Sequence, residues 1–302
     1  MYAITGASGQ TGKRIAEQLL KAGKKVRVIG RNIKSLASLE KQGAQPFVCD
    51  LTDSQRLKEA FSGVQAIYAM EPPNISSLDY RAFQDQVVDA MASAIVAAGV
   101  PFAVTLSSLG ADKSAGTGMI VGQYYLEQVF NQIDSLNVMH LRAGYFMENT
   151  IAQVFIYKAI GVTGGPIKAD LKLPMIATHD IADVATNELL QLNFVGSNTR
   201  ELHGEMDITM TEAMAIFGRA IDVPDLTYNH LTDTEVSAAL LQMGMSENVT
   251  GLILELAAAY NSGHVCALQP RSERTTTPTS YEQFVAEMML PLYKNKRAVQ
   301  ES

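Results

Sequence analysis

The sequence predicts an α/β protein in which a doubly wound parallel sheet is followed by a smaller, mostly helical C-terminal cap. Over the first 150 residues, short apolar runs alternate about six times with segments of helical periodicity, which is typical of a parallel sheet covered by helices on both faces. Beyond this point helical segments dominate. We therefore expect a first domain over residues 1–150 and a cap over residues 151–302, with residues 175–192 returning to the main sheet.

The strands expected in the first domain are short and apolar. They cover residues 3–4, 26–29, 46–49, 66–69, 102–106 and 138–141. Between them, apolar residues recur at helical spacing, as at Ile15, Leu19 and Leu20. The helices expected in the cap cover residues 151–160, 180–192, 211–221, 232–241, 247–260 and 281–289, and its strand candidates lie at 175–177, 200–202 and 226–228. The last ten residues, 293–302, are expected to form a frayed tail.

Composition and charge exclude several classes of protein. The 302-residue chain carries 24 Lys and Arg against 31 Asp and Glu, a formal net charge of −7, which argues against direct binding of nucleic acid through a basic face. Cys49 and Cys266 provide no disulfide framework, which indicates a reducing, cytoplasmic location. The chain opens with an apolar burst that runs at once into a glycine turn, so no leader segment is expected. The most apolar later stretch, residues 94–106, falls short of the ~20 residues that span a bilayer, so we expect no membrane association.

A glycine-rich turn, TGASGQTG over residues 5–12, follows the first strand and opens the first helix. Gly6 permits the tight turn, Gly9 lets the backbone approach a pyrophosphate, and Gly12 allows close helix–strand contact. The N–H groups of Gln10 and Thr11 then point at the phosphates, aided by the helix dipole. The pattern predicts a Rossmann domain that binds a dinucleotide through Gly6, Ser8, Gly9, Gln10, Thr11 and Gly12. The alternative is an ordinary glycine-rich turn.

The end of the second strand bears on which dinucleotide is bound. NAD-binding proteins usually place an Asp or Glu there, whereas this chain has Arg31 and Asn32. Arg31 can pair with a ribose 2′-phosphate through its planar guanidinium, and no carboxylate repels that phosphate. We therefore predict NADP(H) as the cofactor, held by Arg31 and Asn32. The alternative is that Arg31 is a solvated surface charge.

Two further strand ends contribute candidate cofactor contacts. Asp50 and Leu51 close the third strand and could hold the adenine, although Asp50 could instead cap the next helix. The fourth strand ends in Met70, Glu71 and Pro72, and a rigid proline loop at the carboxyl end of a strand would border the ribose and nicotinamide.

Several segments together resemble the NmrA-like family, a branch of the atypical short-chain dehydrogenases. They are TGASGQTG at 5–12, RN at 31–32, DL at 50–51, LRAGYFMEN at 141–149, HDIADVA at 179–185 and TPTSY at 277–281. The resemblance runs from residue 1 to about residue 290. It implies a Rossmann domain, NADP(H) binding and a cleft shared with a C-terminal cap. The family includes quinone and azo-dye reductases, and also regulators that bind the dinucleotide without turning it over.

The Tyr-x-x-x-Lys pair of many short-chain dehydrogenases is absent. None of the 11 tyrosines has Lys four residues later, and Met119 and Gln123 stand where the pair would fall. Reducing a ketone forms a strongly basic alkoxide that needs a proton donor, whereas reducing a quinone forms an oxyanion of pKa ~10 that water can protonate. Alcohol–ketone dehydrogenation is therefore disfavoured, while reduction of a quinone or azo compound stays open, as does the absence of catalysis.

The candidates for the reaction cleft are Ser107, Gln123 and Tyr145. Ser107 ends the fifth strand and could contact a substrate oxygen, or could be a turn or capping serine. Gln123 can hydrogen-bond the ribose as an amide. Tyr145 and Phe146 follow the sixth strand and could wall the nicotinamide pocket, with core packing as the alternative for Phe146.

The spacing of the methionines bears on the class of substrate, and the spacing of the histidines bears on whether a metal is bound. Met206, Met210 and Met214 recur every four residues, which favours a helix core; if they line a pocket instead, its substrate is apolar or aromatic. The five histidines show no ligand spacing, so no metal is expected.

The sequence therefore predicts an NADPH-dependent reductase of quinone-like or other conjugated small molecules. The alternative is a non-catalytic NADP(H) redox sensor that regulates a partner protein. A nucleotide-sugar epimerase ranks last, because it shares the fold but normally needs the missing tyrosine.

Overall fold

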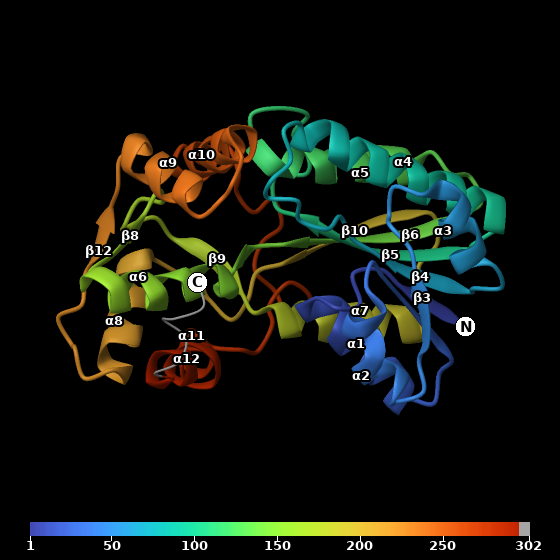
Figure 1. The fold of residues 1–302 in the computed structure, drawn as a ribbon, viewed down its shortest axis with the longest axis horizontal. Helices are drawn as coiled ribbons and strands as arrows, with labels where there is room; N and C mark the ends of the chain where they lie inside the picture. Colours follow the sequence, from blue (N-terminus) through green and yellow to red (C-terminus); the bar gives the residue numbers. More distant parts are fainter. Residues whose placement is uncertain (296–302) are drawn as a thin grey trace.

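The computed structural model describes residues 1–295. A parallel sheet between two layers of helices forms one side of the molecule, and most of the C-terminal region extends to the other side (Figure 1). The expected frayed tail lies outside the described residues from residue 296 onward. Within them, the chain is still helical up to Lys294.

The main sheet has seven strands, all parallel, in the order β10-β6-β5-β4-β1-β2-β3. The strands are β1 (Tyr2–Ile4), β2 (Val26–Gly30), β3 (Gln45–Val48), β4 (Ala66–Ala69), β5 (Phe102–Ser108), β6 (Asn137–Ala143) and β10 (Ser197–Leu202). The strand order reverses at β1, which lies between β4 and β2. Ligands of such sheets bind beside the carboxyl ends of the strands at this switch point.

Helices cover both faces of the main sheet (Figure 1). One face carries α1 (Gln10–Lys21), α2 (Ile33–Glu40) and α7 (Thr178–Gln191), and the other carries α3 (Ser54–Phe61), α4 (Tyr80–Ala98) and α5 (Val121–Asn131). Because successive strand residues point to opposite faces, Ile4 packs in the core under α1 whereas Ala3 packs in the core under α4. The fold class predicted from the sequence is confirmed.

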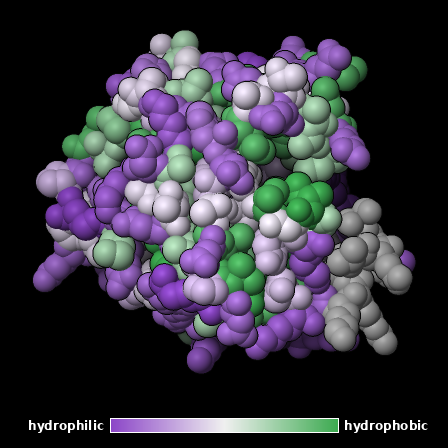
Figure 2. All heavy atoms as spheres, turned by 90° about the vertical axis from the view of Figure 1, so that its left-hand side faces the viewer, coloured by the Kyte–Doolittle hydropathy of each residue, from purple (hydrophilic) through white to green (hydrophobic). Residues whose placement is uncertain are grey.

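The C-terminal region combines short helices with two small sheets. Its helical elements are η2 (Met147–Ile151), α6 (Ala152–Ile160), α8 (Met210–Ala220), α9 (Asp233–Gln242), α10 (Glu247–Asn261), α11 (Tyr281–Phe284), the π-helical η3 (Val285–Met289) and α12 (Leu290–Lys294). A three-stranded sheet pairs β11 (Asp207–Ile208), β9 (Leu173–Ile176) and β7 (Tyr145–Phe146), and a two-stranded sheet pairs β12 (Tyr228–His230) with β8 (Thr163–Gly165). Hydrophilic side chains cover most of its outer end, with hydrophobic ones scattered among them (Figure 2).

The expectation that residues 175–192 return to the main sheet is wrong for the strand. β9 lies in the three-stranded sheet between β11 and β7, and the strand that joins the main sheet is β10. β10 pairs with β6 along its whole length, from Ser197 to Leu202, and this ladder occupies the edge that β9 would need. The helical part of the segment, α7, does pack against α1 and the sheet.

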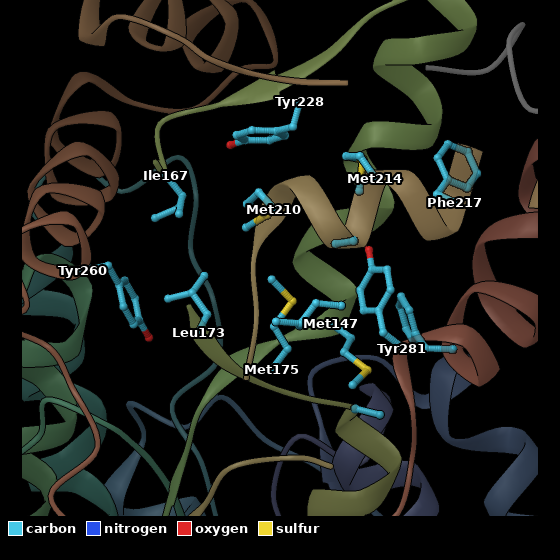
Figure 3. Close-up of a cluster of buried hydrophobic side chains, with 14 of the residues drawn as sticks. Met147, Ile167, Leu173, Met175, Met210, Met214, Phe217, Tyr228, Tyr260 and Tyr281 are labelled. Carbon is cyan, nitrogen blue, oxygen red and sulfur yellow. The ribbon is translucent and has the colours of Figure 1, made fainter. Parts of the chain in front are cut away.

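A methionine- and tyrosine-rich core fills the C-terminal region. Figure 3 shows Met147, Met175, Met210 and Met214 gathered from η2, β9 and α8 beside the rings of Tyr228, Tyr260 and Tyr281. Met210 and Met214 are buried, as the helix-core interpretation predicts, whereas Met206 precedes β11 and is 58% exposed.

Candidate functional site

The glycine turn joins β1 to α1 at the switch point. Gly6 has a φ of +59°, and a Cβ there would lie 2.6 Å from the Met70 sulfur. A Cβ on Gly12 would lie 2.5 Å from the carbonyl oxygen of Gly6. Gly9 is the N-cap of α1, and no side chain caps this helix end. The turn therefore presents the uncapped end of a helix dipole, a geometry that suits an anionic phosphate.

Hydrogen bonds tie the end of β1 to the end of β4. The Thr5 hydroxyl donates to the Tyr68 carbonyl at 3.1 Å and accepts from the Met70 N–H at 3.0 Å. The Tyr68 hydroxyl, at the same strand end, donates to Thr11 Oγ1 at 3.1 Å. These bonds hold the segment that begins with Met70 against the glycine turn. The sequence does not indicate the roles of Thr5 and Tyr68, because their partners lie more than 50 positions away.

The Arg31 side chain is exposed at the end of β2 and bonds to no residue that the structure describes. Its neighbour Asn32 caps α2 by accepting the Lys34 N–H at 2.9 Å. The guanidinium is therefore free for a ligand, while the Asn32 side chain already has a structural role.

At the end of β3, Asp50 does not cap the next helix. Its carboxylate accepts the Thr52 N–H at 3.0 Å and the Thr52 hydroxyl at 2.8 Å, while Asp53 caps α3. The capping alternative for Asp50 is therefore wrong. Leu51 is buried beneath this turn, 6% exposed.

Glu71 is buried between α4 and α5, only 8% exposed. Its Oε2 accepts from Gln84 Nε2 at 2.6 Å and, more weakly, from Gln123 Nε2 at 3.4 Å. Its Oε1 has no hydrogen-bond partner among residues 1–295. Burial raises the pKa of Glu71 to about 8, so this carboxyl carries its proton at neutral pH. Pro72, the next residue, is half-buried.

The Ser107 hydroxyl hydrogen-bonds to a buried ion pair between Glu127 and Arg142. It donates to Glu127 Oε1 at 2.5 Å, and Arg142 donates to both carboxylate oxygens of Glu127 at 2.9 and 2.6 Å. Ser107 is 2% exposed. Its bond joins β5 to α5 and β6 and leaves no open hydroxyl for a substrate. The expected substrate contact is therefore not provided, and the turn and capping alternatives do not describe this serine either.

Gln123 and Met119 stand at the positions of the absent catalytic pair. Gln123 is half-buried on α5, and the carbonyl of Met119, in η1 (Gly118–Ile120), accepts from Gln84 at 3.0 Å. The Tyr125 hydroxyl donates to Asp89 on α4. Neither Met119 nor Gln123 can supply a proton as a tyrosine would.

Tyr145 and Phe146 form β7, directly after β6. The ring of Tyr145 packs edge-on against Tyr260 of α10, with centroids 5.8 Å apart. Burial raises the pKa of Tyr145 to about 12, so its hydroxyl stays protonated. Phe146 packs against the core under α1 and α7 and is half-buried.

One contact network that the sequence did not indicate links the glycine turn to the C-terminal half. The Thr178 hydroxyl, at the start of α7, lies 2.8 Å from Gln10 Oε1 and 2.5 Å from Glu148 Oε1. The Thr178 N–H also donates to Glu148 at 2.9 Å. Glu148 belongs to the segment 141–149, yet nothing in its spacing identifies Thr178 as its partner.

Two negative findings apply to residues 1–295. No three His, Cys, Asp or Glu side chains are grouped as a metal site would require. No helix there combines the length and apolar character needed to cross a membrane.

A seven-stranded parallel sheet with a glycine turn at its switch point places the chain in the class of proteins built on the Rossmann fold. Comparison with known families is more specific. The profile of the NmrA-like family matches residues 2–284, and the chain belongs to that family.

Individual relatives match most of the chain. Quinone oxidoreductase 2 of Escherichia coli (strain K12) is 27% identical over 265 residues, which cover 87% of this chain and 89% of the relative. The crystal structure of an Escherichia coli NADPH-dependent quinone oxidoreductase complexed with NADPH matches with a TM-score of 0.73 and 25% identity, covering 95% of this chain and 99% of the other. Triphenylmethane reductase of Citrobacter sp. matches over the same shares of the two chains, with a TM-score of 0.77 and 18% identity, a likeness of fold.

Proposed function

We propose that this protein binds NADP(H) and transfers hydride from NADPH to quinone-like or other conjugated small molecules. The observation that carries the proposal is the pairing of an uncapped, glycine-lined helix end with a partner-free arginine at the end of the next strand. The first suits a pyrophosphate and the second suits a ribose 2′-phosphate. The relationship to quinone oxidoreductase 2, and to the solved enzyme complexed with NADPH, supports the same cofactor and substrate class.

The proposed cofactor site follows the carboxyl ends of β1 to β6. The glycine turn would hold the pyrophosphate with Gly6, Ser8, Gly9, Gln10, Thr11 and Gly12. Arg31, with the cap residue Asn32, would hold the 2′-phosphate, and Asp50 and Leu51 would border the adenine. Met70, Glu71, Pro72, Gln123, Tyr145 and Phe146 would surround the nicotinamide half. The bound dinucleotide supplies the hydride, and the residues of this chain position it.

The side chains near the proposed nicotinamide site favour quinone-type acceptors. Gln123 stands where a catalytic lysine would be, and the Ser107 hydroxyl is held by Glu127. A ketone would therefore lack the proton donor that its alkoxide needs, whereas a reduced quinone forms a much weaker base. The half-buried ring of Tyr145, backed by the buried ring of Tyr260, would give an aromatic wall to a flat, conjugated substrate.

Stopped-flow spectroscopy tests this function directly. The protein is loaded with NADPH and mixed with a panel of benzoquinones, naphthoquinones and azo dyes, with simple ketones as the matched control. We expect oxidation of bound NADPH by quinones and none by the ketones. Tight NADPH binding without oxidation by any compound would instead favour the redox-sensor alternative, and absence of binding would refute both.

A further inference from the structure

Glu71 is a buried acid that the proposed reaction does not otherwise use. It follows β4 at the switch point, immediately after Met70, whose sulfur lies against Gly6 of the glycine turn. This position places its backbone beside the proposed nicotinamide half of the cofactor. Its side chain turns inward, where Gln84 and Gln123 donate to the same oxygen, Oε2. Its other oxygen, Oε1, is buried and meets no partner in residues 1–295.

The side chain of Glu71 is tightly packed, with only 8% of the residue exposed. A Cβ at Gly122 would lie 2.0 Å from Gln84 Nε2 and 2.6 Å from Glu71 Oε2, so there is no room for any residue larger than glycine at this position. A carboxylate with one uncompensated oxygen is costly in such a place, whereas a carboxylic acid is not.

Few charges face this carboxyl. On α4, Arg81 and Asp85 pair with each other at 2.5 Å, so they largely cancel, and the buried Tyr80 is neutral. On α5, the facing group is the neutral amide of Gln123. On α10, Glu255 lines, with Arg81 and Gln84, a cavity of about 210 Å³ whose lining does not include Glu71. No facing cation is free to hold Glu71 ionised, so a new positive charge near it would change its protonation.

We propose that Glu71 holds a proton while the nicotinamide is reduced and neutral, and releases it when hydride transfer makes the nicotinamide cationic. The inference rests on the proposed function. Hydride from NADPH brings two electrons and one hydrogen to the quinone, and the resulting oxyanion takes one proton to become the hydroquinone. Water supplies that proton, as in the proposed reaction. Glu71 loses its own proton to solvent, the carboxylate formed stabilises the positive ring of NADP⁺, and Glu71 regains a proton when NADP⁺ leaves.

Because the protonation of Glu71 and the binding of NADP⁺ are thermodynamically linked, measurements of cofactor binding test this proposal. A nearby positive ring lowers the pKa of a carboxyl, and by reciprocity loss of the proton tightens binding of that ring. Binding of NADP⁺ should therefore release a fraction of a proton from Glu71, and binding of NADPH should not. If the shift in pKa is one unit, the affinity for NADP⁺ relative to NADPH rises about tenfold between pH 6 and pH 9. The 2′-phosphate is common to both forms, so its own titration cancels in the comparison.

The experiment is isothermal titration calorimetry of the full chain with NADP⁺ and with NADPH. Each titration is run at pH 7.5 in two buffers of different ionisation enthalpy, which gives the number of protons released. We expect more proton release with NADP⁺ than with NADPH. Equal proton release by the two forms would overturn the inference while leaving the proposed function intact, whereas failure of both forms to bind would overturn the proposed function itself.

Two variants locate the proton. Glu71→Gln keeps the shape and both amide contacts but cannot titrate, so the difference between NADP⁺ and NADPH should vanish. Glu255→Gln removes a carboxylate that lines the neighbouring cavity without contacting Glu71, and it should behave as the unmodified protein does. Unchanged proton release in Glu71→Gln would refute the assignment to Glu71. If Glu71→Gln does not fold, the difference in proton release between NADP⁺ and NADPH in the unmodified protein still tests the inference.

Discussion

The free guanidinium of Arg31 gives the most direct test of cofactor choice at the scale of single residues. Arg31→Ala should weaken NADPH binding by about 1.5–3 kcal/mol, the contribution of a charged hydrogen bond, and leave NADH binding nearly unchanged. Fluorescence titration with both nucleotides measures the two affinities. Arg219→Ala, an exposed arginine on α8, serves as the control and should change neither. Equal losses for NADPH and NADH would show that Arg31 does not read the phosphate.

The burial of Glu71 also predicts how the folding stability of the protein depends on pH. Its pKa rises from the ordinary 4.5 to about 8 on folding, so between these values the folded chain keeps a proton that the unfolded chain has lost. Stability should therefore fall as pH rises from about 5 to about 8, by on the order of 3 kcal/mol from this group.

Urea unfolding followed by circular dichroism at pH 5, 6, 7 and 8 checks this expectation. Glu71→Gln should lose less stability over that interval than the unmodified protein, because its side chain does not titrate. Parallel pH profiles for the two proteins would contradict it.

Single residues differ in how far the sequence reveals them. Gly6, Gly9, Gly12 and Arg31 belong to one local turn and the next strand end, so their spacing alone predicts their arrangement. The burial of Glu71 and the engagement of Ser107 depend on α4, α5 and β6, which meet only in the folded chain. No local pattern encodes such contacts.

At the scale of elements, the close packing of α1 on β1 depends on Gly12. In Gly12→Ala the new Cβ would lie 2.5 Å from the Gly6 carbonyl oxygen and 2.9 Å from that of Thr5, both rigid backbone atoms. We expect α1 to shift, with a loss of a few kcal/mol in stability and loss of nucleotide binding.

A matched substitution separates this clash from the general effect of adding a methyl group. Gly251 is exposed within α10 and has open space around it. Gly251→Ala should stabilise the protein by up to about 1 kcal/mol, because alanine favours helix. Thermal unfolding and NADPH titration of both variants measure the contrast. If Gly12→Ala binds NADPH as tightly as Gly251→Ala does, nucleotide binding does not depend on the close packing of α1 against the glycine turn.

The elements of the first half follow from sequence more closely than those of the second. Each of the first six strands is an apolar run ended by turn residues, and the structure places them within two residues of the expected bounds. The sequence does not predict the sheet to which β9 belongs, because a four-residue strand carries no signal of its partner. The β10 ladder decides that β9 pairs with β7 rather than with β6.

At the scale of the whole molecule, the first half of the chain is incomplete without residues from the second. β10 covers the edge of β6, and α7 contributes Ile181, Ala185 and Leu189 to the core beneath the sheet. A chain of residues 1–150 would expose this core and an unpaired strand edge, so we expect it to aggregate or unfold. Gel filtration and circular dichroism, with the full chain as control, test this. A monomeric fragment with a cooperative melting transition would show that residues 1–150 fold alone.

The late position of β10 has a consequence during protein synthesis. Roughly sixty residues separate the start of β6 at Asn137 from the start of β10 at Ser197. At typical elongation speeds, the ribosome needs about 3–12 s to make them. Throughout that interval the nascent chain carries a nearly finished sheet whose last edge is open, a state that chaperones recognise and neighbouring chains can invade.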